Sequence, residues 1–327
     1  MFPKFQTLQQ RAAALTAVRS FFQSLGYLEI ETRALRPTTA TDPYIESFKT
    51  FWCDDKAPYF LQTSPEYAHK ILLSHYRHPI FEIARVFRNE SHGLLHRREF
   101  TLVEWYHPET DYRDMMMETE GLVRAVSASL GASHWISSAR ETACAIPTDT
   151  PFERLTVAQA FERYAGFSPI GMCKSDLVAA ATRMGSRVSA DWSWNDIMNC
   201  VLVDHVEPHL GMKAPTFLMD YPATQASLAT LRQEPSGAVA ERFELYICGI
   251  ELCNGYSELN DPVELRQRFA EDNAERERLG LDRLPDDEDL LKALPALGRL
   301  GGNALGFERL LMLCLGIHDI DEVIIGC

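Results

Sequence analysis

The chain has 327 residues, 46% hydrophobic and 10% aromatic, which supplies enough apolar side chains for a substantial buried core. This composition excludes a disordered protein, and no apolar run reaches the roughly 20 residues of a membrane-spanning helix. The N-terminal sequence lacks the hydrophobic core of a secretory signal, so we expect a soluble protein. The formal net charge of −14 argues against an autonomous nucleic-acid-binding domain, which usually carries a basic surface.

A helix followed by a strand is predicted at the N-terminus. Apolar side chains recur at helical spacing at Leu8, Leu15, Val18, Phe22 and Leu25. Gly26 ends this pattern, and the alternating stretch 27–32 then predicts a strand. Further strands are expected at 58–64 and 79–87, separated by a short helix that begins at Glu66.

The remaining strands are predicted at 99–107, 216–222 and 242–259, the last with a turn at Cys248 and Gly249. Their hairpin spacing favours an antiparallel sheet. Residues 153–211 and 262–297 are predicted as helical insertions, with Thr156 and Asp261 as capping residues. We therefore expect a single domain over 1–327, of the α+β class, with an antiparallel β-sheet flanked by helices.

Three short motifs that could suggest other functions are weak. The histidines of "HVEPH" (205–209) are spaced like metal ligands, but Pro208 would disturb the helix that aligns them. "HGLLH" (92–96) lies in a predicted loop beside arginines, whose charge disfavours a cation. "GGNALG" (301–306) has neither the pattern nor the βαβ context of a dinucleotide site. The eight cysteines are scattered without a CxxC pair, as expected for core residues in a reducing compartment, here the cytoplasm.

Charged and aromatic residues concentrate in three separated segments. The first, "FRNESHGLLHRREFTLVEWY" (87–106), carries Arg88 at the end of one predicted strand and Phe100, Glu104 and Tyr106 on the next. The second, 242–259, has glutamates at every seventh position, namely Glu244, Glu251 and Glu258. The third, 301–316, places Arg309 within an apolar run, where a buried guanidinium needs an anionic partner. Polar hairpin loops and structural salt bridges could explain each segment alone, but explain all three together poorly.

These segments resemble motifs 2 and 3 of class II aminoacyl-tRNA synthetases, with the N-terminal helix and strand in the place of motif 1. Within that class, "TSPEY" (63–67), "FRNE" (87–90), "EFTLVEWY" (99–106) and "GIELCNGYSELND" (249–261) resemble lysyl-tRNA synthetases. The similar region begins almost at residue 8, which leaves no room for an N-terminal anticodon-binding barrel, so tRNA binding is not expected. "PATQASLA" (222–229) and "VAERFE" (239–244) are similar to the free-standing elongation factor P (R)-β-lysine ligases.

The resemblance implies ATP and Mg²⁺ as cofactors and a set of site residues. Arg88 and Arg309 would be catalytic, by stabilising charge on the phosphates. The implied ATP site comprises Arg88, Asn89, Glu90, Arg97, Phe100, Glu251, Leu252, Gly306 and Arg309, with Phe100 stacking on adenine. Glu244 and Glu251 would hold magnesium. The implied site for a lysine-like substrate comprises Ser64, Pro65, Glu66, Glu104, Tyr106, Asn254, Glu258 and Ala304.

Three departures from the family pattern bear on these expectations. "HRREF" (96–100) stands where the family usually has "HNPEF", so that Arg97 replaces an asparagine associated with ATP. Arg33 replaces the usual proline of motif 1, the motif that builds the expected homodimer. Ala304 stands where motif 3 commonly has glycine, and its methyl group would favour a β-amino acid over α-lysine, although alanine there could also be a packing choice.

The implied reaction is ATP-dependent formation of (R)-β-lysyl-adenylate, followed by transfer to a lysine ε-amine of elongation factor P. Two alternatives are a synthetase-like enzyme that acylates tRNA or a small amine, and a catalytically silent regulatory paralogue. The charged residues retained in all three segments argue against the silent paralogue, because unpaired buried charge is costly without a ligand.

Overall fold

A nine-stranded sheet forms the centre of the molecule. The computed structural model describes residues 4–51, 53, 57–138, 143–189 and 191–324. The strand order is β1-β5-β6-β14-β13-β12-β10-β9, and β11 also pairs with β12. These strands are β1 (Leu28–Glu29), β5 (Ile80–Phe87), β6 (Glu99–Pro108), β9 (Glu153–Thr156), β10 (Thr216–Pro222), β11 (Leu231–Glu234), β12 (Gly237–Ile247), β13 (Ile250–Ser257) and β14 (Leu300–Gly306). The predicted α+β class is confirmed.

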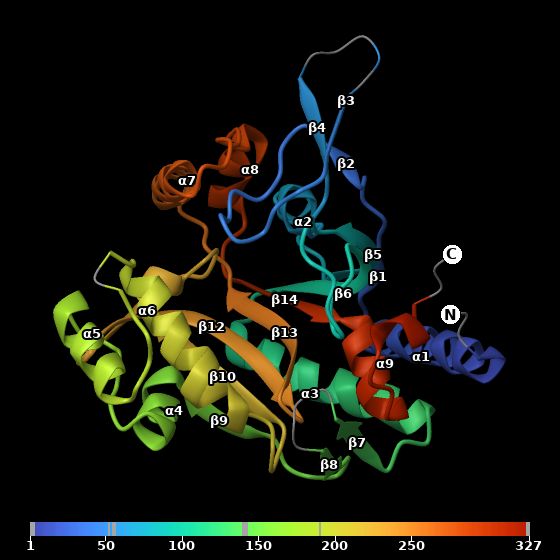
Figure 1. Ribbon diagram of the computed structural model, residues 1–327. Coiled ribbons are helices and arrows are strands. Elements are labelled where there is room, and N and C mark those ends of the chain that lie inside the picture. Colours follow the sequence, from blue (N-terminus) through green and yellow to red (C-terminus); the bar gives the residue numbers. More distant parts are fainter. Residues whose placement is uncertain (1–3, 52, 54–56, 139–142, 190, 325–327) are drawn as a thin grey trace.

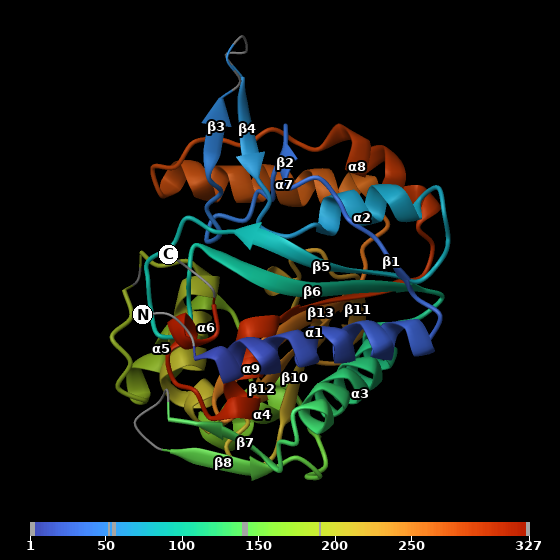
Figure 2. The same cartoon turned by 90° about the vertical axis from the view of Figure 1, so that its right-hand side faces the viewer.

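Helices cover both faces of this sheet (Figure 1). They are α1 (Phe5–Ser24), α2 (Glu66–Leu73), α3 (Tyr112–Ser129), α4 (Val157–Tyr164), α5 (Lys174–Arg183), α6 (Trp194–Val201), α7 (Pro262–Arg278), α8 (Glu288–Ala293) and α9 (Phe307–Leu315). Figure 2 shows α1, α3 and α9 on one side of β5 and β6, with α2, α7 and α8 on the other. Two smaller sheets complete the fold: β2 (Leu35–Arg36), β3 (Lys49–Phe51) and β4 (Pro58–Leu61) form one, and β7 (His134–Ser137) pairs with β8 (Cys144–Pro147).

The sheet is antiparallel through its centre but parallel at both ends. Pairs β5–β6, β6–β14, β14–β13, β13–β12 and β12–β10 are antiparallel, as the hairpin spacing predicts. In contrast, β1 pairs with β5 and β9 with β10 in parallel. Parallel neighbours need a long crossover connection. Residues 30–79 and 157–215 supply these connections, which hairpin-based reasoning could not reveal.

The N-terminal prediction is correct for the helix but too long for the strand. Helix α1 ends at Ser24, and Gly26 follows with φ +81°, a left-handed conformation that glycine adopts at little cost. Strand β1 covers only Leu28–Glu29 of the predicted stretch 27–32. Thr7 and Arg11 are the buried polar residues of α1, and Arg11 donates to Glu308 of α9 at 2.8 Å and so ties the two helices together.

The two predicted helical insertions contain helices and also other structure. The stretch 153–211 begins with β9, whose last residue, Thr156, caps α4 through a capping box. Helices α4, α5 and α6 follow, and the stretch ends in short π and 3₁₀ turns at Leu202–Val206 and Glu207–His209. In 262–297, Asp261 caps α7 by accepting hydrogen bonds from two backbone N–H groups of its first turn. Both capping predictions are therefore confirmed.

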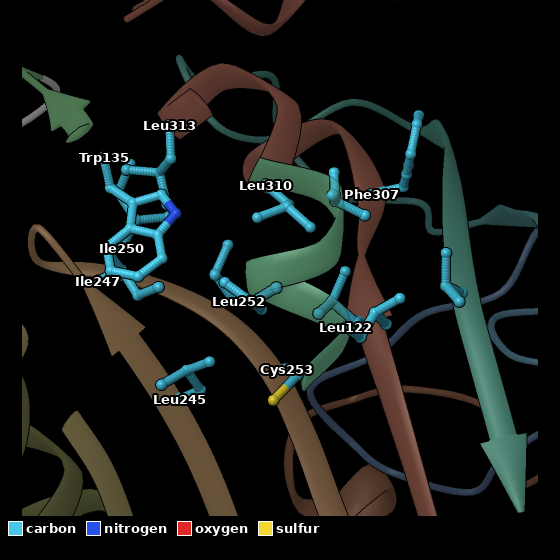
Figure 3. Close-up of a cluster of buried hydrophobic side chains, with 14 of the residues drawn as sticks. Leu122, Trp135, Leu245, Ile247, Ile250, Leu252, Cys253, Phe307, Leu310 and Leu313 are labelled. Atoms are coloured by element: carbon cyan, nitrogen blue, oxygen red, sulfur yellow. The ribbon is translucent and has the colours of Figure 1, made fainter. Parts of the chain in front are cut away.

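Strands β12 and β13 alternate between the hydrophobic core and the opposite face of the sheet. The turn between them uses Cys248 and Gly249, both with positive φ, as expected for a tight hairpin. In Figure 3, Leu245 and Ile247 of β12 face Phe307, Leu310 and Leu313 of α9. Because side chains alternate along a strand, Arg242, Glu244 and Tyr246 point to the other face. Among the described residues, no helix is long and apolar enough to cross a membrane.

Candidate active site

A cavity of about 920 Å³ lies on the face of the sheet opposite the α9 core. Its floor consists of residues from β6, β12, β13 and β14. Its walls come from α7, the first turn of α2, the segment 40–45 and the loop 88–97. The three charged segments of the sequence meet here, because β13, β14 and β6 are neighbours in the sheet although they are distant in sequence.

Two rows of directly paired residues cross the floor. The first row contains Glu104, Ala304, Asn254 and Glu244, on β6, β14, β13 and β12 in that order, and it continues beyond the cavity to Glu82 on β5. Residues paired in this way present their side chains on the same face. The row therefore places acidic side chains on both sides of one small residue, Ala304.

The second row lies two residues further along each strand. It contains Tyr106, Gly302, Tyr256 and Arg242. The central strand, β14, thus presents Gly302, Ala304 and Gly306 to the cavity, all of them small. Phe100 and Tyr106 lie on the same face of β6, six residues and roughly 20 Å apart. This distance separates an aromatic and arginine-rich end of the cavity from an acidic end.

Glu104 is held at the acidic end by hydrogen bonds from Ser64 and Tyr106, each at 2.8 Å. Its side chain is buried, and His69 Nδ1 lies 3.7 Å from its Oε1 atom. Burial and the nearby negative charge of Glu66 raise the pKa of Glu104 to about 8. A cation bound beside it would therefore be strongly stabilised.

Glu66 and Glu258 lie at the same end and share a buried lysine. Lys70 Nζ is 2.6 Å from Glu66 Oε1 and 2.6 Å from Glu258 Oε2. Burial raises the pKa of Glu258 to about 8, although the positive charge of Lys70 opposes this rise. Glu66, Glu258 and Glu104 all line the cavity. The structure thus brings together the three carboxylates predicted to bind a lysine-like substrate.

Arg88 and Phe100 occupy the opposite end. The guanidinium carbon of Arg88 is 5.1 Å from the centre of the Phe100 ring, a cation–π contact. Its buried Nε atom has no hydrogen-bond partner among the described residues. Desolvation is the main influence on the Arg88 pKa and lowers it. An anionic ligand would supply both the missing acceptor and the compensating charge.

Arg309 approaches the same end from the first turn of α9. It donates to the Glu251 carbonyl oxygen at 2.9 Å, and its Nη1 atom is 3.7 Å from the Glu251 carboxylate. Its Nη2 atom is 2.8 Å from His96 Nε2. Burial and the charge of Arg309 lower the pKa of His96, so the imidazole is neutral and accepts this hydrogen bond through Nε2. The anionic partner predicted for Arg309 is thus the Glu251 carboxylate, at a distance near the upper limit for an ion pair.

The two residues predicted to bind magnesium have different surroundings. Glu244 accepts hydrogen bonds from Arg242 at 2.6 Å, Tyr221 at 2.6 Å and Tyr246 at 2.8 Å, which occupy three of about four acceptor positions. Glu251 is 42% exposed toward the cavity. The low-dielectric cavity wall and the charge of Glu244 raise the pKa of Glu251 to about 7. The pair fits a divalent cation, with Glu251 as the main ligand and one lone pair of Glu244 remaining, because a cation would relieve this repulsion.

Every residue predicted for ATP, metal or substrate lines the cavity except Asn89 and Pro65. Asn89 is exposed, and its backbone N–H donates to the Glu46 carbonyl at 2.7 Å. Pro65 is the N-cap residue of α2. Arg97 lines the cavity edge, but its guanidinium lies 2.5 Å from Asp321 and 3.1 Å from Asp319. Its charge is thus already paired with the C-terminal segment, which weakens its predicted role with ATP.

The sequence motifs do not predict several residues of the site. Lys70 is one turn after Glu66 on α2, and Arg242 is two residues before Glu244 on β12, so helical and strand periodicity could have indicated both. His96 appeared only in a rejected metal motif. Gly302 gave no signal of its own, because only its pairing with Tyr106 explains its importance.

Comparison with known proteins identifies the family. A family model described as tRNA synthetases class II (D, K and N) matches residues 4–325, and the chain therefore belongs to this family. Within it, the chain is similar to proteins named elongation factor P (R)-beta-lysine ligase. The protein of that name from Pectobacterium atrosepticum is 39% identical, over 97% of this chain and 93% of the relative. Those from Proteus mirabilis and Salmonella paratyphi A are 38% identical over the same shares. The predicted resemblance is confirmed.

Proposed function

We propose that this protein is an ATP-dependent ligase that activates (R)-β-lysine as an adenylate and transfers it to a lysine ε-amine of elongation factor P. The observation that carries the proposal is the polarity of the cavity, whose two ends are joined by a floor of small residues. One end has three carboxylates, and the other has two arginines and an aromatic ring. A diamino acid joined to AMP has the complementary charge distribution. The similarity to the named ligases supports this choice of substrates.

In the first half-reaction, the substrate carboxylate attacks the α-phosphorus of ATP. A bond forms between the carboxylate oxygen and phosphorus, the bond to the β-phosphate bridge breaks, and pyrophosphate leaves. Arg88 stabilises the negative charge on the α-phosphate, and Phe100 stacks on the adenine ring. Arg309 holds the other phosphates at the N-terminal end of α9. These residues act by electrostatic stabilisation and positioning.

Glu251, with the remaining lone pair of Glu244, would hold Mg²⁺ at this end of the cavity. When bound, the ion supplies charge neutralisation between the phosphates. Arg242, Tyr221 and Tyr246 fix the Glu244 carboxylate in place through their hydrogen bonds. Donors that hydrogen-bond to a metal-binding carboxylate in this way commonly orient it toward the ion.

The acidic end binds the two amino groups of the substrate. Glu104 and Glu258 supply negative charge when they ionise around the bound ammonium groups, with Ser64, Tyr106 and Asn254 beside them. Ala304 lies between Glu104 and Asn254 in the first row, and its methyl group narrows the floor next to the substrate backbone. This methyl group favours the longer backbone of a β-amino acid over α-lysine.

In the second half-reaction, the neutral ε-amine of the acceptor lysine attacks the carbonyl carbon of the adenylate. An amide bond forms, the acyl–phosphate bond breaks, AMP leaves with the electron pair, and the amine loses a proton. The acceptor must enter through the open side of the cavity. We also propose a homodimer, supported by the exposed apolar side chains of Phe5 in α1, Leu25 directly after it and Leu28 in the edge strand β1, and testable by sedimentation. The free thiols of the described residues agree with a cytoplasmic location.

Amino-acid-dependent ATP–pyrophosphate exchange tests the proposal directly. The assay compares (R)-β-lysine, α-lysine and other amino acids, and is followed by intact mass measurement of added elongation factor P. We expect exchange to be strongest with (R)-β-lysine, together with a matching mass gain on the factor. Exchange with α-lysine without protein labelling would instead indicate a tRNA or small-amine acceptor. Absence of exchange with every amino acid would indicate a silent paralogue.

A further inference from the structure

Lys70 is a fully buried lysine directly behind the acidic end of the cavity. Its side chain is 1% exposed, and it is not among the residues that line the cavity. Its ammonium group nevertheless lies 2.6 Å from each of two carboxylates that do, Glu66 and Glu258. Burying a charged lysine side chain is costly. A residue that only filled space at this position would not need a charge.

The charges around Lys70 come from four elements. Glu66 and His69 lie on α2 with Lys70 itself, and Glu258 follows β13. From the sheet, Glu104 and Tyr106 of β6 and Tyr256 of β13 face the same carboxylates. Glu82 of β5 is bonded to His69 at 2.8 Å. Glu66, Glu104 and Glu258 together carry three negative charges when ionised, and Lys70 offsets one of them.

We propose that Lys70 is a positioning residue that holds the Glu66 and Glu258 carboxylates side by side and favours their negative charge, and so sets the acidic end to accept a substrate with two ammonium groups. This inference rests on the proposed function. It adds that Lys70 determines which net charge of substrate the acidic end accepts. When all three carboxylates are ionised, Lys70 leaves a net charge of about −2, which a diamino acid neutralises.

Without the lysine, the buried Glu258 carboxylate and the partly buried Glu66 carboxylate would face each other with no counter-charge. They would respond by taking up protons or by turning apart, because an isolated buried anion is strongly disfavoured. Turning is limited because Glu258 is buried, with its Oε1 atom packed against the backbone of β14 at Gly302. Protonation is therefore the expected response, and a protonated pair would bind a dication poorly.

Lys70→Met tests this role, because methionine fills a similar volume without charge. The measurements are the pH dependence of kcat/KM for (R)-β-lysine in pyrophosphate exchange and of the calorimetric Kd for the same compound. The charge of Lys70 lowers the pKa of Glu258 in the folded protein. Each profile has an acid limb, the range at low pH in which binding or activity falls as carboxylates take up protons. Loss of the Lys70 charge should move this limb to higher pH by about one to three units, the usual effect of removing an adjacent opposite charge.

Two matched variants separate charge from packing. Lys70→Arg retains the positive charge and should leave the acid limb in place, while raising KM through its altered geometry. Lys49→Met removes an equal charge from the surface pair with Asp282 and should change neither profile. A folded Lys70→Met variant with the wild-type acid limb would overturn the proposal.

The role of Lys70 can still be tested if the variant does not fold or if the wild-type protein has no exchange activity. If Lys70→Met does not fold, Lys70→Met in a Glu258→Gln background is compared with Glu258→Gln alone. This background removes the Glu258 carboxylate, so that only the contact of Lys70 with Glu66 differs between the two proteins. Superimposable profiles would reject the role of Lys70. If wild-type protein lacks exchange with (R)-β-lysine but the limb of its Kd still shifts in Lys70→Met, the proposed function fails and the assignment of Lys70 stands.

Discussion

Gly302→Ala should damage the amino-acid end of the cavity without unfolding the protein. A Cβ atom at this position would lie 2.5 Å from Tyr106 Cε1 and 2.7 Å from Tyr106 Cδ1, and it would also collide with Glu258 Oε1. Carbon atoms in contact normally lie about 3.5 Å apart, so the Tyr106 ring must move by about 1 Å. Tyr106 donates a hydrogen bond to Glu104, which would move with it.

A displacement of about 1 Å in a positioned site commonly costs about 100-fold in rate. We therefore expect kcat/KM for (R)-β-lysine in pyrophosphate exchange to fall by about that factor. The KM for ATP should stay within about threefold, because Gly302 is at the opposite end of the floor from Phe100.

Gly93→Ala is the matched control, since a Cβ there would meet only the His96 side chain, with Nδ1 at 3.5 Å and Cβ at 4.0 Å, which are ordinary contacts. Thermal unfolding of both variants shows whether the fold is retained. A folded Gly302→Ala variant with wild-type kcat/KM for (R)-β-lysine would refute this account of the floor.

The remaining predictions concern the phosphate end, substrate choice and pH. Arg309→Ala or Glu251→Ala should abolish adenylate formation in pyrophosphate exchange while circular dichroism stays unchanged; near-normal exchange in either would remove that residue from the ATP site. Ala304→Gly should raise kcat/KM for α-lysine relative to (R)-β-lysine by about 10-fold or more, the usual effect of one methyl-sized space, and an unchanged ratio would contradict the specificity role. The folded-state pKa of Glu104, about 8, exceeds its unfolded value of about 4.3, so folding takes up a proton and this group's stabilisation is lost as pH rises from about 5 to 8. Between pH 5 and 8, the Tm of the Glu104→Gln variant should therefore fall by less than the Tm of wild type in thermal scans. An equal fall of Tm in both proteins would contradict the raised pKa of Glu104.

Local sequence patterns predicted the elements of the sheet well. Alternation predicted β6 and the β12–β13 hairpin, and the turn at Cys248 and Gly249 followed from short-range chemistry alone. The caps at Thr156 and Asp261 were also correct, because a capping hydrogen bond involves residues only a few positions apart. The resemblance to known motifs supplied the candidate residues, and the structure gathers nearly all of them around one cavity.

Long-range pairing was beyond local patterns. The parallel pairs β1–β5 and β9–β10 join strands separated by more than 40 residues, and β9 lies within a stretch that the sequence predicts as a helical insertion. The diversion of Arg97 to Asp319 and Asp321 is of the same kind, since these acids lie more than 200 residues later in the chain. Such contacts depend on how distant elements dock.

The sequence by itself determined the family, the elements and the residue types available for chemistry, because these depend on motifs and on the periods of helix and strand. Only the tertiary structure decided which residues share a row. Strand register placed Ala304 between Glu104 and Asn254, and it set Gly302 against Tyr106. Packing of α2 against the acidic end placed Lys70 within 2.6 Å of Glu258, 188 positions later in the chain. The electrostatics of a buried site depend on such distances, which are established only when the elements pack.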